Sequence, residues 1–162
     1  MGKTSMNAKP SALLRMDNIG IFVDDLEAAI AFFAELGLEL EGKATVEGET
    51  VDRLLGLDGV RSDIAMMQTP DGHSRLELSK FQQPKAIGAD PDTPVNTLGI
   101  RRIMFAVTDI DDVTARLLKH GAELVGEVVQ YEDMYRLCYL RGPEGIMIAL
   151  AEQLRDMPDA VK

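Results

Sequence analysis

Residues 18–42, NIGIFVDDLEAAIAFFAELGLELEG, decide the fold because the chain repeats them. A shift of 84 positions aligns this stretch, without a gap, to residues 102–126, RIMFAVTDIDDVTARLLKHGAELVG. Eight of the 25 positions are identical: Ile19/Ile103, Val23/Val107, Asp25/Asp109, Ala31/Ala115, Gly37/Gly121, Glu39/Glu123, Leu40/Leu124 and Gly42/Gly126. Self-similarity at a fixed spacing indicates copies of one supersecondary unit. The sequence therefore predicts two similar modules joined in one domain.

The first copy begins with an alternating strand over 16–23, followed by a helix over 26–36 whose apolar residues recur every three or four positions. Asp25 is the expected N-cap, and Gly37 is expected to end the helix in a left-handed conformation. Further strands are predicted over 38–46, 61–69 and 73–81. Between them lie a loop with a short helix over 47–59 and a turn at 70–72.

The second copy predicts the same plan. It has a strand over 100–107, a helix over 109–120 ended by Gly121, and strands over 123–129, 135–141 and 146–152, with a turn at 143–145. Each copy is thus a β-α-β-β-β module. The predicted organisation is a tail over 1–14, a single domain over 15–153 and a second tail over 154–162. The domain divides into module one over 15–81, a Pro-containing linker over 82–98 and module two over 99–153.

Composition restricts the class of protein. The chain has 162 residues, 46% of them hydrophobic, which is enough for one sizeable core. Its 17 basic and 27 acidic residues give a formal charge of 17 − 27 = −10, which argues against nucleic acid or an anionic membrane as partner. No apolar run approaches the roughly 20 residues of a membrane span. Cys138 is the only cysteine, which excludes an internal disulfide, and its apolar surroundings predict a packed thiol. We expect a cytoplasmic protein.

A doubled β-α-β-β-β unit with a turn before each final strand resembles the vicinal oxygen chelate superfamily. That superfamily includes glyoxalase I, methylmalonyl-CoA epimerase, extradiol dioxygenases and bleomycin-resistance proteins. The resemblance covers about residues 15–153 and implies an α+β fold. In that fold two tandem modules form a curled, cup-shaped mixed sheet with the helices outside. It also implies that the first and last strands of each module point four side chains at the floor of the cup, where many members hold a divalent metal.

Only one of the four positions that correspond to metal ligands in the superfamily keeps a ligand here. Asn18 stands in the motif Asp17-Asn18-Ile19-Gly20-Ile21 where the first His would be, and Glu77 in Leu76-Glu77-Leu78 matches a ligand. Arg102 replaces the second His, and Ala149 replaces the last Glu. An asparagine is a weak oxygen ligand, an alanine is none, and an arginine is a fixed cation. We therefore expect no metal and no other cofactor.

The altered floor predicts a pocket for a small organic ligand. Glu77 is the candidate catalytic residue, as a general base or as a hydrogen-bond acceptor for the ligand; the alternative is a structural ion pair with Arg102. The candidate ligand-binding residues are Asn18, Arg75, Glu77, Arg102, Met104, Tyr131 and Tyr135. Residues 130–136 are expected to form either a solvated hairpin or a lid whose tyrosines cover the cup. His73 is a weaker candidate for the rim of the pocket.

Three functions remain open from the sequence. The first is a metal-free glyoxalase- or bleomycin-resistance-like protein that binds a small organic molecule, with or without catalysis by Glu77. The second is a metal-dependent lyase, isomerase or epimerase of the same superfamily with an atypical metal site. The third is a scaffold whose cup is vestigial. Because an open sheet leaves unpaired edges, and because the superfamily commonly pairs chains, we also expect a homodimer.

Overall fold

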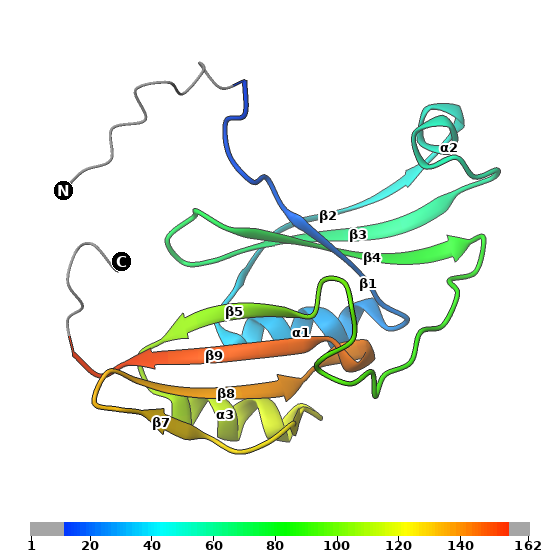
Figure 1. Cartoon of the computed structure of the whole chain (residues 1–162). Coiled ribbons are helices and arrows are strands. Elements are labelled where there is room, and N and C mark those ends of the chain that lie inside the picture. The colour runs from blue at the N-terminus through cyan, green and yellow to red at the C-terminus, as the bar shows by residue number, and fades with distance from the viewer. Residues whose placement is uncertain (1–11, 156–162) are drawn as a thin grey trace.

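A computed structural model describes residues 12–155 of the chain (Figure 1). The predicted tails over 1–14 and 154–162 lie almost wholly outside these residues. Within them the strands form two mixed sheets, one from each module, and two long helices lie behind the strands in the view of Figure 1. The α+β class and the doubled module are confirmed. No helix of the described part is both long and apolar enough to cross a membrane.

Module one contains six elements: β1 (Ile19–Phe22), α1 (Leu26–Leu36), β2 (Glu39–Glu47), α2 (Glu49–Leu55), β3 (Arg61–Gln68) and β4 (Arg75–Gln83). Its strands are ordered β1-β4-β3-β2, with β1 parallel to β4 and the other pairs antiparallel. Parallel pairing of β1 and β4 requires a long connection between them, and α1 with the β2–β3 hairpin supplies it. The helix over 26–36 has the predicted bounds.

Module two contains seven elements: β5 (Arg102–Val107), α3 (Ile110–Lys119), β6 (Glu123–Leu124), β7 (Val129–Tyr131), β8 (Tyr135–Arg141), the 3₁₀ turn η1 (Pro143–Gly145) and β9 (Met147–Gln153). The order β5-β9-β8-β6 repeats that of module one, again with its first strand parallel to its last. The single strand predicted over 123–129 was wrong. The chain bends at Val125 and Gly126, and the segment divides into β6 and β7, which both pair with β8.

The two long helices begin and end as their caps predict. Asp25 accepts a hydrogen bond from the backbone N–H of Ala28 at 3.0 Å, and Asp109 accepts one from Asp112 at 3.1 Å. Asp109 is therefore the cap of α3 rather than its first residue. Gly37 and Gly121 follow the two helices with φ of 124° and 92°, a region that favours glycine. The repeat thus extends to the backbone angles at both helix ends.

The core lies between the sheets and the two helices. Alternation turns Ile21, Leu78, Ile148 and Leu150 inward, where they are buried together with Phe33 of α1. The helix α1 packs on β2, β3 and β4 and also contacts α3 and η1, so the helices join the two modules. Each sheet consequently keeps its other face toward the outside. The curling of both sheets around one shared cup stays a prediction, because β1 and β5 are the ends of two separate sheets.

Arg141 and η1 contact the linker between the two modules. The guanidinium of Arg141 donates to the carbonyl oxygens of Thr93, at 2.7 Å, and Pro91, at 3.5 Å. Gly145 in η1 lies so close that a Cβ atom there would stand 2.1 Å from the Pro91 oxygen. Gly145 also has a φ of 74°. A glycine is therefore required where the linker crosses η1.

The short helix α2 lies at the far end of the β2–β3 hairpin, away from the rest of the molecule in Figure 1. None of its residues is buried, and Leu54 is 80% exposed. Asp52 holds the following loop by accepting hydrogen bonds from the backbone N–H groups of Gly59 at 3.0 Å and Val60 at 2.8 Å. The predicted loop with a short helix is confirmed.

Candidate functional site

Glu77 lies on the outer face of the module-one sheet, in the middle of β4. Its register partners are Gly20 on β1 and Met66 on β3. Gly20 has no side chain, and a Cβ added there would meet nothing closer than a Phe22 ring atom at 3.8 Å, so space remains beside the carboxylate. The Ser79 hydroxyl donates to Glu77 at 3.4 Å. Glu77 forms no ion pair with any described residue.

Two other candidates of module one have partners in the protein. The Nε of Arg75 lies 2.9 Å from an oxygen of Glu41 on β2. The amide of Asn18 donates to Asp17 at 2.8 Å, and this hydrogen bond, opposed by burial and aided by Arg15 and Arg75, lowers the pKa of Asp17. Arg75 shares the outer face with Glu77 because the two are separated by two positions on β4. The structure therefore brings Arg75 and Glu77 together on β4.

Arg102 forms no ion pair with a carboxylate of the described residues. Its guanidinium carbon lies 5.5 Å from the centroid of the Tyr139 ring, within the range of a cation–π contact. Ala149 on β9 is fully buried and is the register partner of both Met104 on β5 and Tyr139 on β8. The predicted ion pair of Glu77 and Arg102 is not formed. The two residues belong to separate sheets, and Arg102 lies against an aromatic neighbour in its own sheet.

Strand register assigns the two tyrosines to one face. Tyr131 of β7 is paired directly with Tyr135 of β8, and directly paired residues share a face. Tyr135 alternates with Leu137 and Tyr139, so both tyrosines lie on the outer face that also carries Arg102 and Met104. Residues 130–136 are the turn of the β7–β8 hairpin. Two hydrogen bonds of 2.7 and 2.9 Å join Arg136 to Asp111 of α3. The role of residues 130–136 as a lid stays a prediction.

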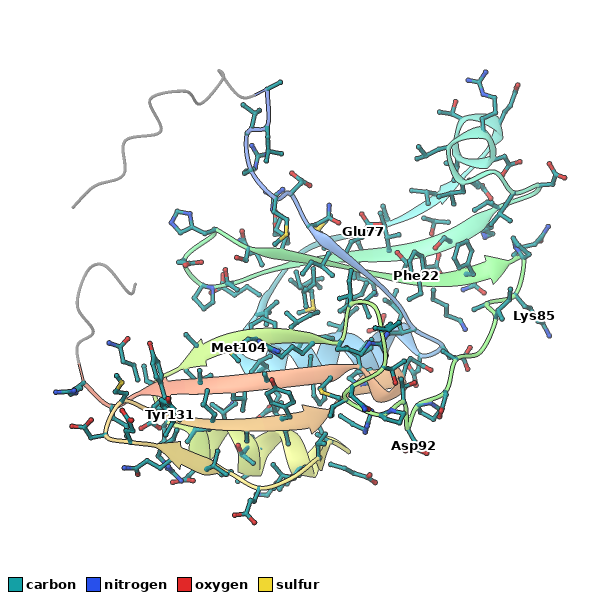
Figure 2. The ribbon with its side chains drawn as sticks, in the orientation of Figure 1. Phe22, Glu77, Lys85, Asp92, Met104 and Tyr131 are labelled. Carbon is teal, nitrogen blue, oxygen red and sulfur yellow. The ribbon has the colours of Figure 1, made fainter. Side chains whose placement is uncertain are left out.

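A cleft of about 650 Å³ opens beside the free edge of β5. Six consecutive residues, 103–108, line it, and side chains of both faces therefore border the cleft. The opposite wall comes from the turn between β3 and β4, from the end of α1 and from Met16 and Ile19. Figure 2 shows Met104 on the module-two sheet, whereas Glu77 lies on the module-one sheet. Of the predicted site residues, Arg75 and Met104 line this cleft.

The sequence did not indicate several residues of the cleft. Asp71 was assigned to the turn over 70–72, and Thr69 and Ser74 to the ends of the two flanking strands. Thr69 donates to Asp71 at 2.6 Å, and Asp71 accepts the backbone N–H of His73. These bonds, led by that from Thr69, lower the pKa of Asp71. Arg116 of α3 also lines the cleft and pairs with Asp112 at 3.0 Å. His73 itself does not line it. The sequence indicated a turn followed by a strand here. It did not indicate which part of the molecule the turn faces.

The described residues contain no group of three or more His, Cys, Asp or Glu side chains that could hold a metal ion. The four positions that correspond to ligands in the superfamily do not supply a set of metal donors. Glu77 is the only carboxylate, Arg102 lies on Tyr139, and Ala149 has no donor atom. These residues do not fit a divalent ion.

Comparison with known proteins agrees with the fold. The family model for the Glyoxalase/Bleomycin resistance protein/Dioxygenase superfamily matches residues 15–150. A glyoxalase family protein from Bacillus cereus is 60% identical in sequence, with a TM-score of 0.86 over 90% of this chain and 97% of its own. The Escherichia coli protein YaeR is 25% identical over 142 residues, which cover 87% of this chain and 98% of YaeR.

A more distant structure is the fosfomycin resistance protein FosX from Listeria monocytogenes, solved with Mn(II) and 1S,2S-dihydroxypropylphosphonic acid. It is 13% identical, with a TM-score of 0.57 over 90% of this chain and 93% of its own, and this likeness shows the fold alone. The family match spans both modules, and the repeat, the strand order and the parallel pairing of first and last strands agree with it. The chain belongs to the Glyoxalase/Bleomycin resistance protein/Dioxygenase superfamily.

Proposed function

We propose that this protein binds a small organic molecule in the cleft beside β5 and that it does so without a metal. The observation that carries this proposal is that Arg75 of module one and Met104 of module two, both candidates from the sequence, line one cleft of about 650 Å³. Ligand pockets for small molecules commonly have volumes of roughly 300–1,000 Å³. A site between two modules also fits this class of pocket.

The lining of the cleft favours a ligand with a mainly apolar body. Leu36, Leu76, Phe105 and Val113 contribute apolar surface, and Met104 is 44% exposed at the edge. The arginines that line the cleft, Arg75 and Arg116, already have carboxylate partners. Apolar walls with few polar groups bury the body of an organic ligand and fix its orientation through those groups.

The open edge of β5 adds backbone groups to the cleft. β5 pairs with β9 on one side, and its other side ends the sheet order. The N–H and C=O groups of an edge strand are directed along the plane of the sheet. A ligand with an amide or hydroxyl group can therefore form hydrogen bonds with this edge while its body contacts the apolar walls.

Glu77 is the proposed residue for any catalysis by this protein. It is half-buried, Gly20 leaves space beside it, and among residues 12–155 it accepts only the weak hydrogen bond from Ser79. A carboxylate with an unused oxygen is suited to accept a proton or a hydrogen bond from a ligand. Glu77 does not line the β5 cleft, so a role for it requires that part of the ligand reach the outer face of the module-one sheet.

The cleft is tested by a screen of small organic molecules, with thermal unfolding as the readout. A ligand at 100 times its dissociation constant stabilises the folded state by about 2.7 kcal/mol. Ala106 is exposed and lines the cleft, and Ala106→Trp should abolish the stabilisation by filling the space. Ala31→Trp is the matched control, because Ala31 is exposed on α1 and does not line the cleft. Equal ligand effects in both variants would refute the location.

The second candidate is a metal-dependent lyase, isomerase or epimerase, and the observation that favours it is that Glu77 keeps a ligand position. Protein purified without chelator and dialysed against zinc, nickel or manganese should contain well under one metal per chain. Arg102→His with Ala149→Glu should raise the metal content. Because Ala149 is buried under its neighbours, the double variant must be checked for folding by circular dichroism. Stoichiometric metal that is lost on Glu77→Ala would favour the enzyme.

A further inference from the structure

Four arginines of the described residues have no carboxylate partner, although the chain has 27 acidic residues. The other six arginines each form an ion pair with an aspartate or glutamate: Arg15, Arg61, Arg75, Arg116, Arg136 and Arg155. The four without one are Arg53, Arg101, Arg102 and Arg141. Arg53 lies on the outlying helix α2, whereas the remaining three lie together at one end of the module-two sheet.

Strand register places these three arginines. Arg102 and Arg141 are both register partners of Met147, so they flank it in one row on the outer face. Neighbouring strands are about 4.8 Å apart, which separates the two Cα atoms by about 10 Å. Arg101 immediately precedes β5, and because neighbouring residues of an extended chain point to opposite faces, it contributes charge here rather than another group in this row. Figure 2 shows that this end of the sheet faces the linker that carries Asp92.

Arg102 has hydrogen-bond donors that no residue of the described part of the chain uses. Arg102 is exposed and makes only the contact of its flat face with Tyr139, and it donates no hydrogen bond to a described residue. The Nε of Arg101 is buried and has no hydrogen-bond partner among the described residues. Arg141 is fixed by the carbonyls of Pro91 and Thr93 and adds a third positive charge. A guanidinium carries five N–H donors in a planar fork that matches an oxyanion.

We propose that Arg102, with the charges of Arg101 and Arg141 nearby, binds an oxyanion, namely the phosphate, phosphonate, sulfonate or carboxylate group of a ligand. Contact with Tyr139 covers one face of the Arg102 guanidinium and leaves its N–H edge available for a bidentate hydrogen bond. Like charges at adjacent positions raise the local potential, which favours an anion in an otherwise acidic protein.

The proposed site also names the class of ligand for the cleft, and this part rests on the proposed function. Met104 lines the cleft and lies two positions from Arg102 on the same face, about 7 Å along the strand. A molecule with an apolar body in the cleft would therefore place an anionic end group at Arg102. The expected ligand is a small amphipathic anion rather than a cation.

The oxyanion site is tested without an organic ligand, with inorganic phosphate as the probe and acetate as a second arm. Titration at constant ionic strength should shift the Nε–Hε signal of Arg102 in NMR spectra. Arg102→Gln should weaken phosphate binding about tenfold, the effect of losing a charged bidentate hydrogen bond. Arg102→Lys should recover only part of the affinity, because a lysine keeps the charge but lacks the fork.

Arg53→Gln is the control, since Arg53 also lacks a carboxylate partner and its loss changes the net charge equally. It should bind phosphate as the unaltered protein does. The proposal is overturned if neither anion shifts the Arg102 signal, if Arg102→Gln binds normally, or if Arg53→Gln loses as much affinity. These outcomes do not depend on the cleft. Phosphate binding that persists in Ala106→Trp, together with a failed ligand screen, would refute the proposed function and leave the oxyanion site standing.

Discussion

The contact between Gly145 and the linker makes a sharp prediction about stability. In Gly145→Ala the new Cβ would stand 2.1 Å from the Pro91 oxygen and 2.5 Å from its Cα. These atoms belong to the backbone, so the linker must move by roughly 1 Å to reach an ordinary contact distance. That movement breaks the 2.7 Å hydrogen bond from Arg141 to Thr93, which we estimate at about 1.5 kcal/mol for a bond with a charged donor.

The left-handed backbone adds a second cost, because an alanine at positive φ loses about 1 kcal/mol. With the residual overlap, Gly145→Ala should lower the free energy of unfolding by about 3 kcal/mol. Gly121→Ala is the matched control, because Gly121 also has a positive φ, but no atom lies within 4 Å of the place that a Cβ would take there. It should cost about 1 kcal/mol.

The assay is urea denaturation of both variants, compared at a common slope. Adding Arg141→Met to each variant separates the two costs, because the arginine change should matter less once Gly145→Ala has already displaced the linker. Equal losses in Gly145→Ala and Gly121→Ala would refute the close contact. Strict additivity of Gly145→Ala and Arg141→Met would show that the linker does not move.

Three further predictions concern assembly, reactivity and acid stability. Light scattering at micromolar concentration should give the mass of a homodimer, and a strictly monomeric mass would contradict this expectation. Burial raises the pKa of the Cys138 thiol, so a thiol reagent should label it only after unfolding; rapid labelling of the folded protein would show that the strand opens. The hydrogen bond from Arg136 lowers the pKa of Asp111 below its ordinary value of 3.8. The stabilisation from this hydrogen bond is present above pH 3.8 and is lost as the pH falls toward the lower pKa of the folded state. Acid should therefore destabilise Asp111→Asn less than the unaltered protein.

Most of the fold could be predicted because its signals are local. The bounds of α1 follow from an apolar stripe between an aspartate cap and a glycine, and the structure has the same bounds. The strand over 135–141 was also predicted with its observed bounds. The prediction of a single strand over 123–129 failed because the chain bends there. The segment over 123–129 has strand-like residues, but Gly126 lies where the chain leaves β8 and returns to it.

The candidate site was less predictable, because its parts depend on how separate elements meet. Alternation assigned Arg75 and Glu77 to one face, and this follows from β4 alone. The partner of Arg102 did not follow, since an aromatic residue 37 positions later in the chain occupies its flat face. The β5 cleft is formed by a strand edge and a turn, neither of which has a periodic signal in the sequence.

Two edge strands, β2 and β5, differ in how they resist unwanted association with other chains. The edge strand β2 carries Glu39, Glu41, Lys43 and Glu47 and has an irregular register between Leu40 and Gly42. Charges and bulges of this kind block edge-to-edge pairing with other chains. The edge strand β5, RIMFAV, has one charge, and its free edge borders the cleft between the modules. A fragment containing only module two would expose this strand fully and should precipitate when expressed alone.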